Sequence, residues 1–235
     1  MPTPDGAPSA GRHVLVVADG DVPPRAALDA AWPGWDDAVA AVIAADGGLA
    51  RARAVGLQPT LLVGDLGSLD PALIAAAEAS GPPIRRSPAA KDESDTELAL
   101  LAALDDGATR VTVLGAFGGP RLDHALANVW LLAHPALEGI EVTLLDARTR
   151  ASLLSAPGPD GLPVQRPLAG RPGATVSLLP FGGDATGVTT RGLRYPLHDE
   201  PLHVGPARGL SNVREAADAE VTLRDGRLLV IEIAP

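Results

Sequence analysis

Four short polar clusters interrupt the largely apolar first half of the chain. They are residues 46–48 (DGG), 64–68 (GDLGS), 91–95 (KDESD) and 118–124 (GGPRLDH), the last followed by Asn128. Each follows, or lies close after, a short apolar run of the kind that predicts a β-strand. Open α/β sheets bind ligands beyond the carboxyl ends of their strands. Four such clusters in one region therefore indicate a single site.

The acidic residues of these clusters have the chemistry of a divalent-cation site. Asp65 follows an apolar run and Gly64, which lets the backbone turn sharply. Asp92 and Asp95 are three residues apart at the start of a predicted helix, so both carboxylates can face one side. Each acid alone would be an ordinary cap or turn residue. Together with Lys91 they favour Mg²⁺, which prefers oxygen ligands and shares them with substrate phosphates.

The glycine-rich cluster suits a polyphosphate. Arg121, Asp123 and His124 follow Gly118 and Gly119 and enter a predicted helix. A helix start gathers free N–H donors, and arginine adds fixed positive charge. A lone histidine is more often a surface residue, but the neighbours of His124 favour a functional role.

Composition excludes several classes of protein. There is no cysteine, which removes disulfides, Cys-bound zinc and thiol catalysis. The net charge of −10 and the lack of a basic stripe argue against nucleic acid as a partner. The only lysine, Lys91, precedes an aspartate, so a Walker-A loop is absent, as is the dinucleotide-binding glycine fingerprint. No apolar run approaches the ~20 residues of a membrane span, and we expect a cytoplasmic protein.

The order of the predicted elements divides the chain into two domains. After a flexible leader at 1–12, residues 13–150 alternate strands with helical patterns, which predicts an α/β domain with a mostly parallel sheet. The expected strands are 13–18, 40–45, 60–63, 110–115 and 140–145. The expected helices are 93–104, opened by a Ser94–Glu97 capping box, and about 122–133, ended by Pro135.

The last third of the chain predicts a small all-β sandwich domain. Residues 151–173 are rich in proline and glycine and are expected to form a connection. Within the β-domain, 174–235, we expect strands at 175–179, 187–190, 219–223 and 228–233. Asp225-Gly226 predicts a hairpin turn between the last two.

The motifs AADGG, VGDLGS, KDESDTELAL, GAFGGPRLDHALAN, RGLRYPL and GLSN, in this order, resemble those of thiamine pyrophosphokinases. The resemblance runs from about residue 44 to 212, with a matching β tail to 232. It implies an α/β catalytic domain, a substrate-binding β-sandwich, and a homodimer whose active site lies between the catalytic domain of one subunit and the β-domain of the other. The implied reaction moves a diphosphate from ATP to the hydroxyl of thiamine, with Mg²⁺ as the metal.

The resemblance also assigns roles to individual residues. By analogy, Asp65, Asp92 and Asp95 would hold Mg²⁺ and the ATP phosphates, and together with Arg121 and Asp123 they are the expected catalytic residues. Asp123, Ser211 and Asn212 would contact thiamine. The wider ATP site would include Asp46, Gly47, Gly48, Lys91, Gly118, Gly119, Arg121, His124 and Asn128.

The sequence departs from the family pattern at two positions and leaves two alternatives open. Gly67 stands where a second aspartate is expected, and Val213 follows Ser-Asn where an acidic or small polar residue is common. One alternative is a diphosphokinase of another hydroxymethyl heterocycle, such as a pterin. The other is a non-catalytic nucleotide-binding regulator that kept the fold and lost part of the metal site.

Overall fold

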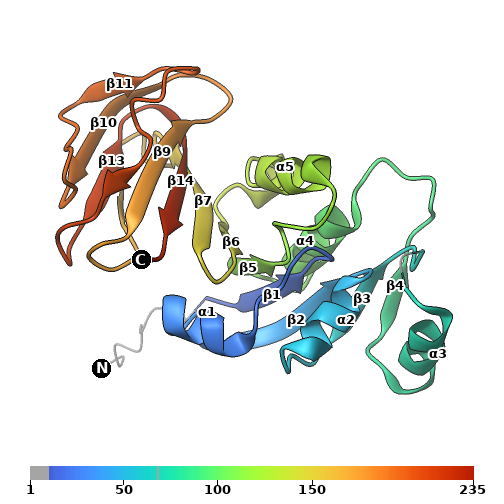
Figure 1. Cartoon of the computed structure of the whole chain (residues 1–235). Coiled ribbons are helices and arrows are strands. Elements are labelled where there is room, and N and C mark those ends of the chain that lie inside the picture. The colour runs from blue at the N-terminus through green and yellow to red at the C-terminus, as the bar shows by residue number, and fades with distance from the viewer. Residues whose placement is uncertain (1–10, 68) are drawn as a thin grey trace, which may run out of the picture.

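A ten-stranded mixed sheet runs through the whole molecule. The computed structural model describes residues 11–67 and 69–235 (Figure 1). Most of the expected leader and Ser68 of the second polar cluster lie outside the described residues. The strand order is β12-β9-β14-β7-β6-β5-β1-β2-β3-β4. A second sheet has the order β11-β10-β13-β8. The predicted fold class, an α/β part followed by a β-sandwich, is confirmed.

The six strands from β6 to β4 are all parallel. They are β1 (His13–Val17), β2 (Val39–Ala45), β3 (Leu61–Gly64), β4 (Ile84–Arg86), β5 (Arg110–Leu114) and β6 (Glu141–Leu145). Five of them coincide with the apolar runs predicted as strands. The interior of β1 is fully buried, as expected for a parallel strand covered on both faces.

Helices cover both faces of this parallel region (Figure 1). On one face lie α1 (Arg25–Ala31), α2 (Gly48–Ala54) and α3 (Pro71–Ser80), and on the other α4 (Asp95–Asp105) and α5 (Leu122–Leu131). The predicted capping box is confirmed: Ser94 accepts a hydrogen bond from the Glu97 amide at 3.1 Å, and the Glu97 carboxylate accepts one from the Ser94 amide. A short 3₁₀ turn, η1 (Pro135–Leu137), follows α5.

The C-terminal third forms a sandwich that shares one sheet with the α/β part. Strands β7 (Thr149–Ala156), β14 (Gly226–Ile233), β9 (Thr175–Pro180) and β12 (Asn212–Val213) continue the large sheet, because β7 pairs antiparallel with β6. The second layer consists of β8 (Val164–Pro167), β10 (Ala185–Arg191), β11 (Glu200–Leu202) and β13 (Glu220–Leu223). A buried cluster that includes Val176, Leu178, Val188, Val221 and Leu228 joins the two layers.

The structure corrects two expectations about this part. The stretch 151–173 is not simply a connection: its first residues belong to β7, a central strand, and β8 lies at the edge of the smaller sheet. The hairpin predicted at Asp225-Gly226 is also wrong, because β13 and β14 belong to different sheets. Leu223 and Leu228 are both fully buried in the core between the layers, so the turn connects the layers instead of pairing its two strands.

Within the described ranges, no helix has both the length and the apolar character needed to cross a bilayer.

Candidate active site

The chain order of the parallel strands creates a crevice between β1 and β5. From β1 the chain moves outward through β2, β3 and β4, and then returns to place β5 and β6 on the other side of β1. Ligands bind such sheets where the strand order reverses. The loops beyond β1 and β5 are joined there, because the Gly20 amide donates to the Gly115 carbonyl at 3.0 Å and the Asp21 amide to the Phe117 carbonyl at 2.9 Å.

A cavity of about 560 Å³ opens beside this crevice. Its lining comes from the loops after β1, β5 and β6, with Asp21, Phe117, Gly118 and Arg148, and from Ile233 at the end of β14. This volume lies within the range of small-molecule sites. The cavity also borders the glycine-rich loop predicted to hold a polyphosphate.

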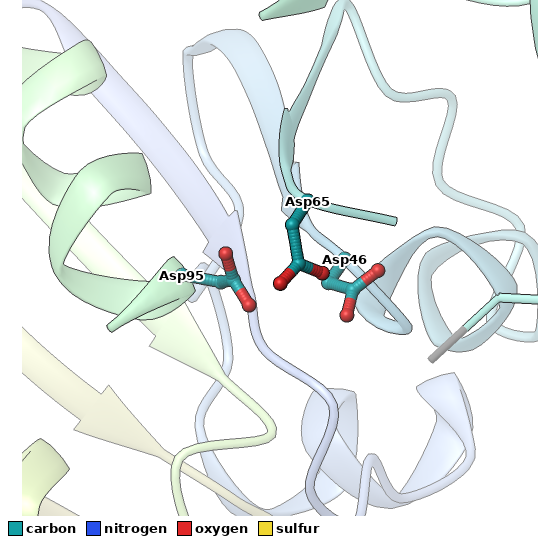
Figure 2. A group of neighbouring side chains, drawn as sticks. All are labelled: Asp46, Asp65 and Asp95. Carbon is teal, nitrogen blue, oxygen red and sulfur yellow. The ribbon is translucent and has the colours of Figure 1, made fainter. Parts of the chain in front are cut away.

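Three carboxylates converge at the same edge of the sheet. Asp46 follows β2, Asp65 follows β3, and Asp95 is the first residue of α4. One carboxylate oxygen from each lies within 4.8 Å of the others, and Figure 2 shows the three side chains directed into a shared space. Two unit charges at that separation repel by roughly 3 kcal/mol at an effective dielectric constant of 20. The cluster therefore favours positive charge between its members.

Backbone geometry brings these three acids together. Asp46 is 5% exposed and has a φ of 45°, a left-handed conformation that aspartate tolerates better than most residues. Gly64 has a φ of 145°, and a Cβ there would lie 3.1 Å from Asp95 Oδ1 and 3.2 Å from Asp46 Cβ. A side chain at position 64 would thus combine backbone strain with crowding of two of the three acids.

Lys91 supplies part of the positive charge. Its ammonium donates to Asp95 Oδ1 at 2.5 Å and to Ser87 Oγ at 2.7 Å, and its side chain is 12% exposed. Lys91 was expected to contact ATP. In this structure it holds Asp95 in place at the start of α4 and offsets one of the three carboxylate charges.

The observed cluster differs from the predicted set of three acids in one member, because it contains Asp46 and not Asp92. Asp92 is exposed and is not a member of the group, whereas Asp46, expected near ATP, is. Gly67 stands beside the cluster: its amide donates to Asp65 Oδ1 at 2.7 Å, and a Cβ there would lie 3.0 Å from that oxygen. An aspartate at position 67 would therefore require Asp65 to shift.

Gly47 and Gly48 act in packing next to the cluster. Gly47 is the residue before α2, and Gly48 is buried at its start. A Cβ on Gly48 would lie 1.9 Å from the Val17 carbonyl oxygen, so only glycine lets the helix begin directly against the end of β1.

Arg121 and Asp123 form an exposed ion pair at the start of α5. Arg121 donates from Nε and Nη2 to the two carboxylate oxygens of Asp123 at 2.9 and 2.6 Å. The hydrogen bond from Arg121 is the main reason that the pKa of Asp123 falls to about 2. Both side chains are more than 60% exposed, so they are accessible to a ligand. Asp123 is thus a weak proton acceptor at neutral pH.

The other residues predicted in this cluster have distinct environments. The Gly119 amide donates to Asp21 Oδ2 at 3.1 Å, which links the glycine-rich loop to the loop after β1. His124 is exposed on the first turn of α5. Asn128 is buried, and its amide group donates to the Ala116 carbonyl at 2.9 Å, which fixes α5 against the end of β5.

Ser211 and Asn212 lie far from the carboxylates within one chain. Asn212 begins β12, which is seven strand spacings from β2 in the large sheet. At about 4.8 Å per spacing, this is roughly 30 Å. Asn212 accepts hydrogen bonds from the amides of Tyr195 and Val213 and donates to the Tyr195 carbonyl at 2.7 Å, and so holds the loop at 195.

Sequence reasoning missed the acidic loop after β1. Asp19 pairs with Arg51 at 3.5 Å beside the start of α2, and Asp21 both lines the 560 Å³ cavity and accepts from Gly119. The sequence pattern could have identified this loop, because residues 19–21 (DGD) follow an apolar run just as the four polar clusters do.

A parallel sheet with converging acids at its carboxyl edge, followed by an antiparallel sandwich, defines an α/β enzyme with an appended β-domain. Two family models match this division: the thiamin pyrophosphokinase catalytic domain over residues 35–144, and the thiamin pyrophosphokinase vitamin B1 binding domain over 164–228. The chain belongs to the thiamin pyrophosphokinase family.

Individual relatives agree with this assignment. The chain is 26% identical over 198 residues to a thiamine pyrophosphokinase of Bacillus subtilis, covering 84% of this chain and 89% of the relative. A solved thiamin pyrophosphokinase family protein from Enterococcus faecalis superposes with a TM-score of 0.77 at 26% identity, covering 95% of this chain and 99% of the other. The fold of yeast thiamin pyrophosphokinase is also similar, with a TM-score of 0.74 at 16% identity over 96% of this chain and 87% of that one.

Proposed function

We propose that this protein is a thiamine diphosphokinase, which transfers a diphosphate from ATP to the hydroxyl of thiamine and releases AMP. The observation that carries the proposal is the convergence of Asp46, Asp65 and Asp95 at the carboxyl edge of the sheet. Both domains of the family are present, and the match to a vitamin B1 binding domain favours thiamine over a pterin as acceptor.

The donor set of the acidic cluster fits Mg²⁺. Asp46, Asp65 and Asp95 offer only carboxylate oxygens, the ligands that a hard cation prefers. Lys91 offsets one of the three negative charges, so a divalent cation would balance the other two. A bound Mg²⁺ supplies charge that neutralises phosphate oxygens during transfer. We therefore propose these three aspartates as the ligands.

ATP would extend from the acidic cluster along the crevice between β1 and β5. The 560 Å³ cavity and the glycine-rich loop at Gly118 and Gly119 lie at this crevice and support that position. Arg121 is exposed and can exchange its bond with Asp123 for a phosphate, because a guanidinium binds either anion through two parallel hydrogen bonds. Positioning and charge stabilisation are the main contributions expected of the protein.

In the proposed reaction, the thiamine hydroxyl oxygen bonds to the β-phosphorus of ATP. The bond between that phosphorus and the oxygen bridging to the α-phosphate breaks, and AMP leaves with the bridging oxygen. The proton of the thiamine hydroxyl is released to solvent water during transfer. An aspartate of ordinary or lowered pKa is a weak base at neutral pH, so we assign Asp123 to orienting the thiamine hydroxyl and not to taking up its proton.

We propose that the active site is shared between the subunits of a homodimer. The roughly 30 Å between β12 and β2 prevents Ser211 and Asn212 from reaching the acidic cluster of their own chain. A surface for self-association is available on α5, where Leu122, Leu126 and Trp130 recur every fourth residue and are 73%, 46% and 61% exposed. Because ATP and Mg²⁺ are required, we also propose a cytoplasmic location.

The products of the reaction test this proposal. Protein is incubated with ATP, Mg²⁺ and either thiamine, a hydroxymethylpterin or no acceptor, and the nucleotides are separated. We expect AMP only with thiamine. Release of ADP would contradict diphosphate transfer, and AMP formed only with the pterin would identify the other acceptor. Bound ATP with no AMP under any condition would support the non-catalytic regulator.

A further inference from the structure

A second cavity, of about 310 Å³, lies away from the acidic cluster. It is formed over β5, β6 and β7 on the sheet face that carries α1 and α2. On this face α1 packs over the carboxyl ends of β1, β5 and β6, and its last residue, Ala31, lines the cavity. The cavity shares no lining residue with the 560 Å³ cavity or with the three converging aspartates.

The charged groups that line this cavity are mostly cationic. Arg110, Arg150 and Arg171 line it, and Glu141 is the one acid among the lining residues. His13 lies on its floor, with its pKa lowered chiefly by burial and further by Arg110. His13 Nδ1 lies 2.9 Å from Arg110 Nη2 and 3.0 Å from the Asp37 carbonyl oxygen, and its Nε2 lies 3.0 Å from Thr112 Oγ1. Three arginines and one carboxylate thus line a single cavity in a chain of net charge −10.

These arginines keep donors available. Arg150 lies 3.5 Å from Glu141, and Arg171 donates to the Ala30 carbonyl at 3.4 Å, the long end of hydrogen-bonding distance. Each guanidinium carries five N–H groups, so most remain unused by the described residues. Arg166, which interacts electrostatically with Arg150 but does not line the cavity, has its Nη2 group buried without a hydrogen-bond partner among the described residues, and burial lowers its pKa to about 10.

Two tryptophans give this cavity an apolar wall that is fixed in position. Trp32 and Trp35 line it, and their indole N–H groups are anchored at 2.8 Å by the Asp146 carbonyl and by Asp29. The amides of Ala169 and Gly170, which also line the cavity, donate to the buried carboxylate of Glu232 at 3.1 and 2.7 Å. The cavity therefore needs little rearrangement to accept a ligand.

We infer that this cavity binds a small organic anion whose carboxylate or phosphate contacts Arg150 and Arg171 and whose apolar part packs against Trp32. Its size suits a ligand smaller than a nucleotide. The site is separate from the proposed catalytic site, and the inference does not depend on the proposed function.

Tryptophan fluorescence offers a direct test. The chain has three tryptophans, so a Trp130→Phe background leaves Trp32 and Trp35, both at the cavity, as the only reporters. Phenyl phosphate, benzoate and the uncharged benzyl alcohol are titrated in turn. We expect a saturable change with at least one of the two anions, whose relative affinities distinguish phosphate from carboxylate, and none with benzyl alcohol. Excess ATP with Mg²⁺ should not displace the anion.

Arginine variants identify the contacts. Arg150→Gln and Arg171→Gln should each raise the dissociation constant about tenfold, the loss expected for a charge-assisted hydrogen bond. Arg85→Gln is the control, because Arg85 is an exposed arginine that pairs with Asp105 outside this cavity, and its loss should leave the dissociation constant unchanged. Because Arg171 is exposed, its variant should fold even if Arg150→Gln does not. No saturable signal, an equal response to benzyl alcohol, displacement by ATP, or unchanged binding in Arg171→Gln would overturn the inference.

Discussion

A heterodimer of two defective subunits tests whether the active site is shared. One subunit carries Asp65→Asn, which removes a proposed Mg²⁺ ligand. The other carries Asn212→Ala, which releases the loop that Asn212 holds through its bonds to Tyr195 and Val213. In a shared arrangement, one of the two sites combines both defects, and the other combines an intact catalytic domain with an intact β-domain.

The expected activities follow from this geometry. Loss of a group that stabilises transition-state charge lowers turnover by roughly 100-fold or more, so sites with Asp65→Asn count as inactive. Loss of the Asn212 bonds, at about 1.4 kcal/mol, lowers kcat/KM for thiamine about tenfold. A shared site therefore gives the heterodimer about half of wild-type activity at low thiamine. If each site is instead built within one chain, only the Asn212→Ala subunit is active, and the heterodimer has about a twentieth of wild-type activity.

Two affinity tags on the two subunits allow the heterodimer to be purified, and AMP release at thiamine far below KM gives its activity. The two homodimeric variants serve as controls, and thermal unfolding verifies that each is folded. An activity near one twentieth in a folded heterodimer would refute the shared site, and a monomer in sedimentation would refute the dimer itself.

Three further predictions concern the metal cluster, the capping box and pH. Asp46→Asn should lower AMP release about 100-fold and raise the Mg²⁺ requirement, whereas Asp92→Asn, outside the cluster, should have a far smaller effect; equal losses would contradict the ligand set. Ser94→Ala should lower the free energy of unfolding by about 1 kcal/mol in urea titrations, and no change would show the cap to be dispensable. Since the folded state lowers the pKa of His13 below 6.5, the unfolded chain takes up this proton more readily. Stability should therefore fall as pH drops below 6.5, and His13→Gln should flatten that slope.

Local signals predicted much of the fold. Buried parallel strands appear in the sequence as apolar runs and could therefore be located. The Ser94–Glu97 capping box predicted the start of α4 to within two residues. The pairing of β6 with β7 could not be predicted, because nothing in either sequence specifies which strand of another domain is its neighbour. The Asp225-Gly226 turn was misassigned for the same reason: a turn dipeptide does not reveal whether the strands it joins pair or pack face to face.

The candidate site was predicted in location more accurately than in detail. Asp65 and Asp95 were expected together because both lie at strand or helix ends on one edge. The choice of Asp46 over Asp92 depends on the left-handed backbone at Asp46, on the space left by Gly64, and on the path of the chain before α4. None of these can be inferred from the spacing of the residues. Lys91 was recognised as functional, but its bonds to Ser87 and Asp95 required the three-dimensional structure.

The continuous large sheet also limits how this protein can be divided. Removing everything after residue 146 would leave β6 as a terminal strand whose last three residues, all buried in the intact chain, would lose β7 as their pairing partner. Exposed edges of this kind recruit other strands and promote aggregation. The catalytic half should therefore precipitate when expressed by itself, and chimaeras that exchange the acceptor-binding half will need to carry β7 and β14 with it.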